Sequence, residues 1–212
     1  MHAPVALQRV LAAGVTYAAI RRLSRRQAPL PERGPKAAAH LTAVLRFPLD
    51  VASALDLGAL PASRSHYRYP LSTLHVTVAN LDQACVPAPV GVEALRALTF
   101  EPVTLRLDGF GCSRDTLFIR CSYGEELAVL RRAVRRAFAL PRPFNPVKAA
   151  FGQLAFANVL RFDGPGVAPA RGQGPEGLVV LDNLDVVRTD RYLSDEATTV
   201  LARVPLDRCS AG

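Results

Sequence analysis

Two residues whose side chains can transfer a proton and hold an anionic oxygen stand two positions apart, at His75 and Thr77. They open residues 75–81 (HVTVANL), whose β-branched and apolar content predicts a strand. Because side chains alternate along a strand, we expect His75, Thr77 and Ala79 on one face and the two valines on the other. An imidazole beside a hydroxyl on one sheet face is suited to acid–base chemistry and to binding an anion.

The same frame recurs at residues 153–159 (QLAFANV), which share Ala-Asn at the same offset and apolar residues at alternate positions. Two facing His-x-Thr strands would form a phosphoester site, with one imidazole as base, the other as acid, and two hydroxyls on the phosphate oxygens. In the second copy the polar pair has become Gln153 and Ala155. Glutamine can hydrogen-bond a phosphate but cannot exchange a proton near neutral pH, and alanine has no hydroxyl.

No other histidine replaces the missing one by sequence, since the remaining three, His2, His40 and His66, all precede the first copy. His40 also begins a His-x-Thr triplet, which we interpret as fortuitous because it opens a strand directly after an Ala-rich linker. Lys148 and Arg161 flank the second copy and are candidates to supply positive charge to a phosphate. Arg161 could equally point to solvent.

The composition is that of a soluble globular protein: 212 residues, 50% hydrophobic and 21% charged. The net charge of +8 favours a polyanionic or phosphorylated partner, with solvated arginine clusters as the alternative. The four cysteines form no Cys-x-x-Cys pair, although Cys112 and Cys121 could face each other across a hairpin. With no signal peptide evident, we expect reduced thiols and a cytoplasmic location. No apolar run is long enough for a membrane span.

The chain divides into an N-terminal helix and linker, residues 1–36, and one domain, residues 37–212. Residues 3–20 are mostly apolar and are followed by four arginines, and Pro and Gly then mark the linker. This helix could dock on the core, lie on an anionic membrane surface as a peripheral contact, or pack on a partner chain.

Within the domain, the pattern predicts strands at 40–47, 75–81, 103–108, 116–121, 150–162, 178–187 and 199–206, and helices at 50–56, 90–98 and 124–140. Residues 109–111 (GFG) are the expected turn of a hairpin. The helix at 124–140 has a basic side, which we expect to be solvated or to contact nucleic acid, formed by Arg131, Arg132, Arg135 and Arg136. This order predicts an α+β class, a bilobal pseudo-twofold fold in which two small antiparallel sheets line a central cleft with helices outside.

From about residue 38 onward, the chain resembles the 2H phosphoesterase superfamily, the cyclic phosphodiesterase and 2′-5′ RNA ligase-like proteins. The resemblance rests on residues 75–78 (HVTV), 105–111 (LRLDGFG) and 116–120, the helix beginning at Gly124, and the ending at 184–206. It implies the bilobal fold and an activity on 2′,3′-cyclic phosphates or 2′-5′ linkages that needs no metal or cofactor. It also implies that His75 is the first catalytic histidine, that Thr77 is the first phosphate-binding hydroxyl, and that the second motif is degenerate.

Our hypothesis is therefore a protein that acts on or binds a nucleotide or RNA end with a cyclic or terminal phosphate. His75 and Thr77 are its catalytic candidates, and Thr77, Gln153, Lys148 and Arg161 are its phosphate-binding candidates. General acid or base catalysis contributes roughly 10² to 10⁴-fold in rate, so losing one partner predicts impaired catalysis. The alternatives are a non-catalytic phosphate- or nucleotide-binding module, or an interaction protein that uses the N-terminal helix.

Overall fold

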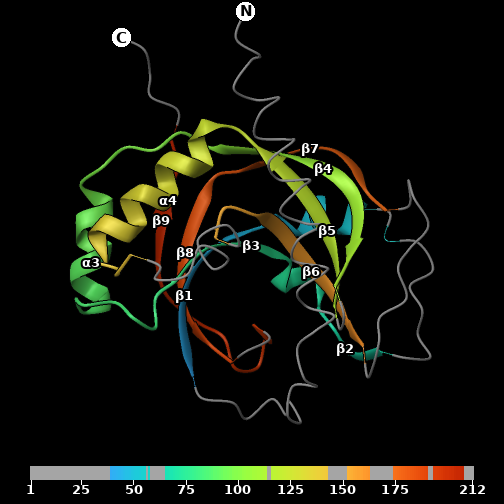
Figure 1. Ribbon diagram of the computed structural model, residues 1–212, viewed down its shortest axis with the longest axis horizontal. Coiled ribbons are helices and arrows are strands. Elements are labelled where there is room, and N and C mark those ends of the chain that lie inside the picture. Colours follow the sequence, from blue (N-terminus) through green and yellow to red (C-terminus); the bar gives the residue numbers. More distant parts are fainter. Residues whose placement is uncertain are drawn as a thin grey trace, which may run out of the picture.

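The computed structural model describes residues 39–55, 57, 65–113, 116–142, 152–162, 174–190 and 193–207. The expected N-terminal helix, its linker and Lys148 lie outside these residues. The described chain forms two antiparallel sheets and few helices (Figure 1). The predicted α+β class with two antiparallel sheets is confirmed.

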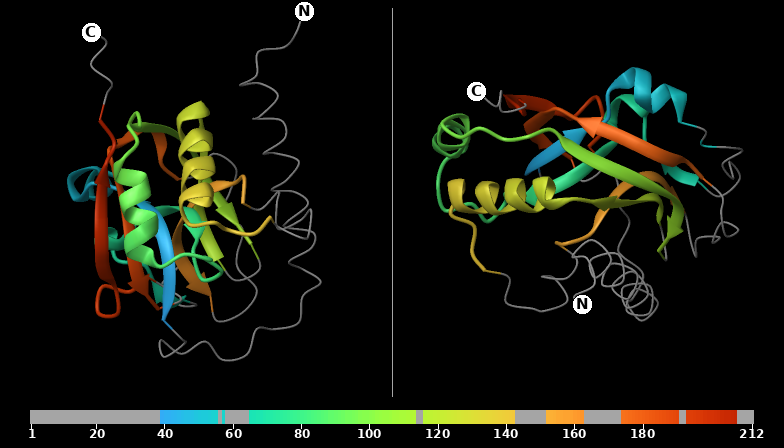
Figure 2. Two further views of the ribbon diagram at one scale, coloured as in Figure 1. Left: turned by 90° about the vertical axis from the view of Figure 1, so that its left-hand side faces the viewer. Right: turned by 90° about the horizontal axis from the view of Figure 1, so that it is seen from above.

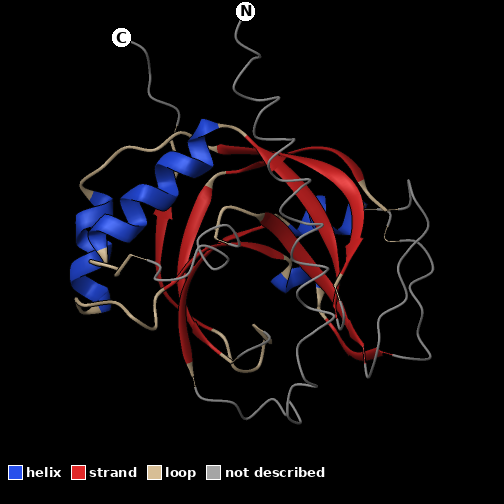
Figure 3. Cartoon of the chain, viewed as in Figure 1, coloured by secondary structure: helices blue, strands red, loops and turns tan. Residues whose placement is uncertain are grey.

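The first sheet has the strand order β3-β1-β8-β9 and is built from β1 (His40–Arg46), β3 (His75–Asn80), β8 (Asn183–Thr189) and β9 (Thr199–Pro205). The second sheet has the order β2-β6-β5-β4-β7 and is built from β2 (Ser65–Arg68), β4 (Val103–Cys112), β5 (Thr116–Tyr123), β6 (Ala155–Phe162) and β7 (Glu176–Leu181). The helices are α2 (Leu49–Ala54), the 3-10 helix η2 (Leu71–Thr73), α3 (Ala88–Arg96) and α4 (Glu125–Ala137). Helices α3 and α4 lie together outside the strands (Figure 3).

One apolar core joins the two sheets, because each contributes one face to it. Helix α4 packs on β3 of the first sheet and on β4 of the second (Figure 2). Its apolar side recurs at helical spacing, as predicted, and is fully buried at Leu127, Leu130, Val134 and Phe138. Helix α3 packs against α4, where Gly91 leaves room for the ring of Phe138. Two smaller buried clusters lie outside this core, one formed by Val44, Val187 and Leu193 and the other by Leu117, Leu160 and Phe162.

Several predicted elements have different limits in the structure. Residues 178–187 are not one strand: β7 ends at Leu181 in the second sheet, and β8 starts at Asn183 in the first. The turn predicted at 109–111 is wrong, because β4 continues to Cys112 through an irregularity at which Gly109 takes a positive φ of 70°. An isolated glycine in a strand is compatible with a bulge as well as a turn.

Strand β2 was not predicted, and it pairs with β6 at the edge of the second sheet. Cys112 and Cys121 do not face each other, since their partners in the β4–β5 pairing are Leu117 and Leu107. In the described part of the chain, no helix is long and apolar enough to cross a membrane.

Candidate functional site

His75 and Thr77 lie on the face of β3 that points away from the core. Val76, which lies between them, and Val78, which follows Thr77, are buried in the core, as the alternation predicted. His75 is only 4% exposed, whereas Thr77 is exposed. The prediction is wrong for Ala79: the β1–β3 register shifts between Ala43 and Val44, and Ala79 pairs with Ala43 and packs against the core. The polar face of β3 is therefore the His75–Thr77 pair without the alanine.

The protonation state of His75 is fixed by its surroundings. Its Nδ1 lies 2.7 Å from the carbonyl oxygen of Thr73, and since a carbonyl only accepts, Nδ1 carries the proton and Nε2 the lone pair. Burial, assisted by the positive charge of Arg46 and opposed by the Thr73 hydrogen bond, lowers the pKa of His75 to about 4. At neutral pH the imidazole is therefore neutral. Its Nε2 can accept a proton or a hydrogen bond but has no proton to donate.

Charged side chains continue across the first sheet from His75. Arg46 is its directly paired neighbour on β1, so the two side chains share a face. Arg46 Nε lies 3.4 Å from the carboxylate of Asp185 on β8, and Arg203 on β9 donates two hydrogen bonds to that carboxylate, at 2.8 and 3.1 Å. His75, Arg46, Asp185 and Arg203 thus form a row over all four strands. The last three could not be identified from the sequence, because their proximity depends on the strand order.

Strand β6, the second copy of the His75 strand, contacts β3 across the junction between the sheets. Arg131 of α4 links them: Nη2 donates to the carbonyl oxygens of Thr77, at 3.1 Å, and of Leu154, at 2.6 Å. Its Nη1 donates to the hydroxyl of Tyr123, which donates to the carbonyl oxygen of Gln153. The two related strands therefore meet, as the internal similarity predicted.

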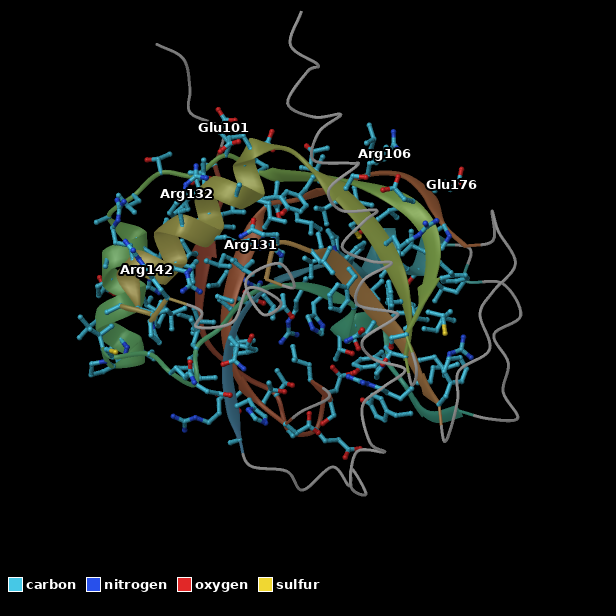
Figure 4. All side chains as sticks on the ribbon, in the orientation of Figure 1. Glu101, Arg106, Arg131, Arg132, Arg142 and Glu176 are labelled. Carbon is cyan, nitrogen blue, oxygen red and sulfur yellow. The ribbon has the colours of Figure 1, made fainter. Side chains whose placement is uncertain are left out.

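The prediction of a solvated basic side on α4 is wrong for Arg131, which is 6% exposed. Its neighbour Arg132 is exposed and paired with Glu125, and Figure 4 shows the two arginines on different sides of the helix. The guanidinium of Arg131 also lies over the ring of Tyr123, 5.1 Å from its centroid. The sequence pattern predicted that all four arginines of this side lie at the surface. Only the tertiary contacts show that Arg131 is buried and structural.

The face of β6 that points away from the core carries different residues from those predicted. Ala155, Ala157 and Val159 are in the core. Leu154, Phe156 and Asn158 therefore alternate onto the opposite face of β6, and Leu154 and Phe156 take the places that correspond to His75 and Thr77. The bulge in β3 adds one residue between Thr77 and the shared Ala-Asn. The structural counterparts of His75 and Thr77 on β6 are therefore one residue later than the sequence similarity predicts. In both registers the second copy lacks an ionisable group and a hydroxyl.

The remaining candidates have separate positions. Gln153 is exposed and lies two residues before the start of β6. Arg161, at the other end of β6, donates to the hydroxyls of Tyr69, at 3.2 Å, and Thr116, at 2.8 Å, which ties it into the second sheet. His40 lies 2.6 Å from Asp82, whose carboxylate also accepts from the backbone of Leu41. This contact supports the interpretation that the His-x-Thr triplet at His40 is fortuitous.

The connection between β8 and β9 brings negative charge near η2 and β2. Ser72, three residues before His75, donates to Asp195 at 2.6 Å. Burial, with smaller contributions from Asp190, Tyr69, Asp195 and Glu196, raises the pKa of Tyr67 to about 12. The described residues contain no group of three or more metal-ligating side chains.

No protein-family model matches the sequence, and no curated protein matches it. Several solved structures match it in fold. A structure of LigT from E. coli complexed with 3′-AMP superposes with a TM-score of 0.59 at 16% identity, covering 80% of this chain and 98% of LigT. A crystal structure described as a phosphoesterase superposes with a TM-score of 0.58 at 16% identity, covering 81% of this chain and 100% of that one.

This chain has the fold of these two proteins. TT0787 of Thermus thermophilus also shares it, with a TM-score of 0.54 and 19% identity over 79% of this chain and 97% of TT0787. The resemblance to phosphoesterases found in the sequence is thus confirmed for the fold. Because the matched chains are covered almost completely, the phosphoesterase-like fold accounts for the described β-sheets and helices together.

Proposed function

We propose that this protein binds a nucleotide or RNA end carrying a cyclic or terminal 2′- or 3′-phosphate on the His75–Thr77 face, with slow or no turnover. The observation that carries the proposal is the pairing, on one face of β3, of an exposed hydroxyl that can donate to a phosphate oxygen and an imidazole whose Nε2, free of the Thr73 bond, can contact an anion once it takes up a proton. Further support comes from LigT, which shares the fold and has been solved with 3′-AMP, NADP+ and ATP.

Binding is favoured over efficient catalysis because the proposed chemistry needs an acid as well as a base. His75 offers an acceptor at Nε2, and the corresponding face of β6 offers Leu154 and Phe156. A missing acid costs roughly 10² to 10⁴-fold in rate. A pKa near 4 also makes His75 a weak base. These features support a binding protein or a strongly impaired phosphoesterase.

The direct test is calorimetric titration of the full-length protein with 3′-AMP, with adenosine as the control that lacks the phosphate. We expect saturable 3′-AMP binding that weakens with salt, and Thr77→Val should weaken it about ten- to a hundredfold, the loss of a hydrogen bond to a charged group. Absence of 3′-AMP binding at low salt would overturn the proposal. The proposal of impaired catalysis would be wrong if the wild type opened 2′,3′-cyclic AMP at the rates of efficient enzymes and His75→Gln abolished that activity.

A further inference from the structure

The row His75–Arg46–Asp185–Arg203 contains more positive charge than its one carboxylate balances. Asp185 is almost fully buried and carries one negative charge between two guanidinium groups. The row therefore has a net charge of +1, because His75 is neutral. The Arg203 side chain is 59% exposed and remains in water, whereas the Arg46 side chain is only 23% exposed, so Arg46 is the cation of the row for which a nearby anion would offset the loss of water.

The two arginines use Asp185 unequally. Arg203 occupies both carboxylate oxygens with hydrogen bonds of 2.8 and 3.1 Å. Arg46 reaches the same carboxylate only at 3.4 Å, and its buried Nε has no hydrogen-bond partner among the residues that the structure describes. A buried donor without a partner is costly, typically about 1–3 kcal/mol. Arg46 is thus held in place by charge while part of its hydrogen-bonding capacity remains unused.

Arg46 also lies where a ligand at His75 would be. Residues paired directly across antiparallel strands have Cβ atoms roughly 4.5–5.5 Å apart, and Arg46 is paired with His75. Thr77 is two residues along the same face and is paired with Val44. The Arg46 side chain is 23% exposed, so part of it is open to solvent although its Nε is buried. A planar guanidinium can donate two parallel hydrogen bonds to phosphate oxygens.

We propose that Arg46 is a phosphate-binding residue, and that Arg46 and Thr77 donate hydrogen bonds to an anion that lies beside His75 on the first sheet. This inference rests on the proposed function and specifies its site. It removes the need for a second motif in binding, because the positive charge comes from β1 instead of β6. It also gives Asp185 and Arg203 a role, since the pair fixes one side of the Arg46 guanidinium.

The experiment compares three variants by calorimetric titration with 3′-AMP. Arg46→Gln should weaken binding about ten- to a hundredfold, the loss of a charged hydrogen-bonding partner, and should reduce the salt dependence of the affinity. Arg46→Lys keeps the charge and should retain part of the affinity. The matched control is Arg188→Gln on β8, which removes the same charge from an exposed side chain on the opposite face of the same sheet. It should leave affinity within about twofold, since surface charges are screened.

A second measurement needs no variant to bind or to be stable. In the wild-type protein, addition of inorganic phosphate should shift the Arg46 Nε–H resonance in a ¹H–¹⁵N spectrum, and the resonance of Arg188 should remain in place. The inference is wrong, and the proposed function stands, under the following results. The wild type binds 3′-AMP and Thr77→Val weakens that binding, but Arg46→Gln leaves the affinity unchanged and phosphate does not shift the Arg46 resonance. If the wild type binds neither 3′-AMP nor phosphate, the proposed function fails and the inference fails with it.

Discussion

Arg131 donates a hydrogen bond to the carbonyl oxygen of Thr77 at 3.1 Å, and so connects helix α4 to the strand that carries the candidate site. The same guanidinium nitrogen donates to Leu154, at the start of β6. One buried arginine therefore ties together the two strands whose sequences are alike. The position of Thr77 relative to the second sheet depends on this side chain.

We expect Arg131→Met to lower the free energy of unfolding by about 2–5 kcal/mol, because it removes this donor from the buried carbonyl oxygen of Leu154 and from the part-buried one of Thr77. Urea denaturation followed by circular dichroism measures the change. The control is Arg132→Met, which removes an exposed ion pair with Glu125 and should cost less than about 1 kcal/mol. Equal effects of the two substitutions would show that the Arg131 contacts add nothing to stability.

Restoring the second motif at the register of the sequence similarity should not restore activity. The double variant Gln153→His, Ala155→Thr places its threonine in the core, where Ala155 is 1% exposed. A buried hydroxyl without a partner costs about 1–3 kcal/mol. We therefore expect a destabilised protein with unchanged hydrolysis of 2′,3′-cyclic AMP, as measured by chromatography of the product. A large gain in hydrolysis would mean that residue 155 faces the ligand after all.

The sequence predicted the fold class and the polar pair on β3 because both follow from short-range patterns. Val76 and Val78 alternate with His75 and Thr77, and this periodicity does not depend on which strands are neighbours. The pattern failed at Ala79 and Ala155, where a one-residue bulge changed which face a side chain occupies. The contact between β1 and the Asp185 carboxylate could not be found from spacing, because β1 and β8 are far apart in the sequence and meet only through the strand order.

The depressed pKa of His75 makes stability depend on pH over a defined range. In the unfolded chain a histidine takes up its proton near pH 6.5, whereas folded His75 does so only near pH 4. Between these values the unfolded state binds the additional proton, so stability is complete above about pH 6.5 and falls as the pH is lowered to 4. The full shift corresponds to a loss of about 3 kcal/mol.

Urea denaturation at several pH values between 7 and 4 measures this loss, with His75→Gln as the reference that lacks the titrating group. Carboxylates titrate in both proteins, so the difference between the two curves isolates His75. We expect that difference to shrink, or to change sign in favour of the variant, as the pH falls. Parallel curves over the whole range would contradict the assignment of a buried, neutral imidazole.

Ligand binding on the His75–Thr77 face should be coupled to protonation of the same imidazole. An anion near His75 favours the charged form, so it raises the pKa of His75 from about 4 towards the normal range. By linkage, the complex takes up a proton, and affinity increases as the pH is lowered from 7 to 5. A cyclic phosphodiester is the suitable ligand, because its single negative charge does not change in this range.

Calorimetry with 2′,3′-cyclic AMP at pH 6, in two buffers with different enthalpies of ionisation, measures the protons taken up. We expect fractional uptake in the wild type and none in His75→Gln, in which an amide replaces the imidazole. Thr77→Val is the matched control, since it removes a ligand contact two residues away but no titrating group. It should weaken binding and keep the proton uptake. Uptake that persists in His75→Gln would place the responding group elsewhere, and the ligand would then not lie against His75.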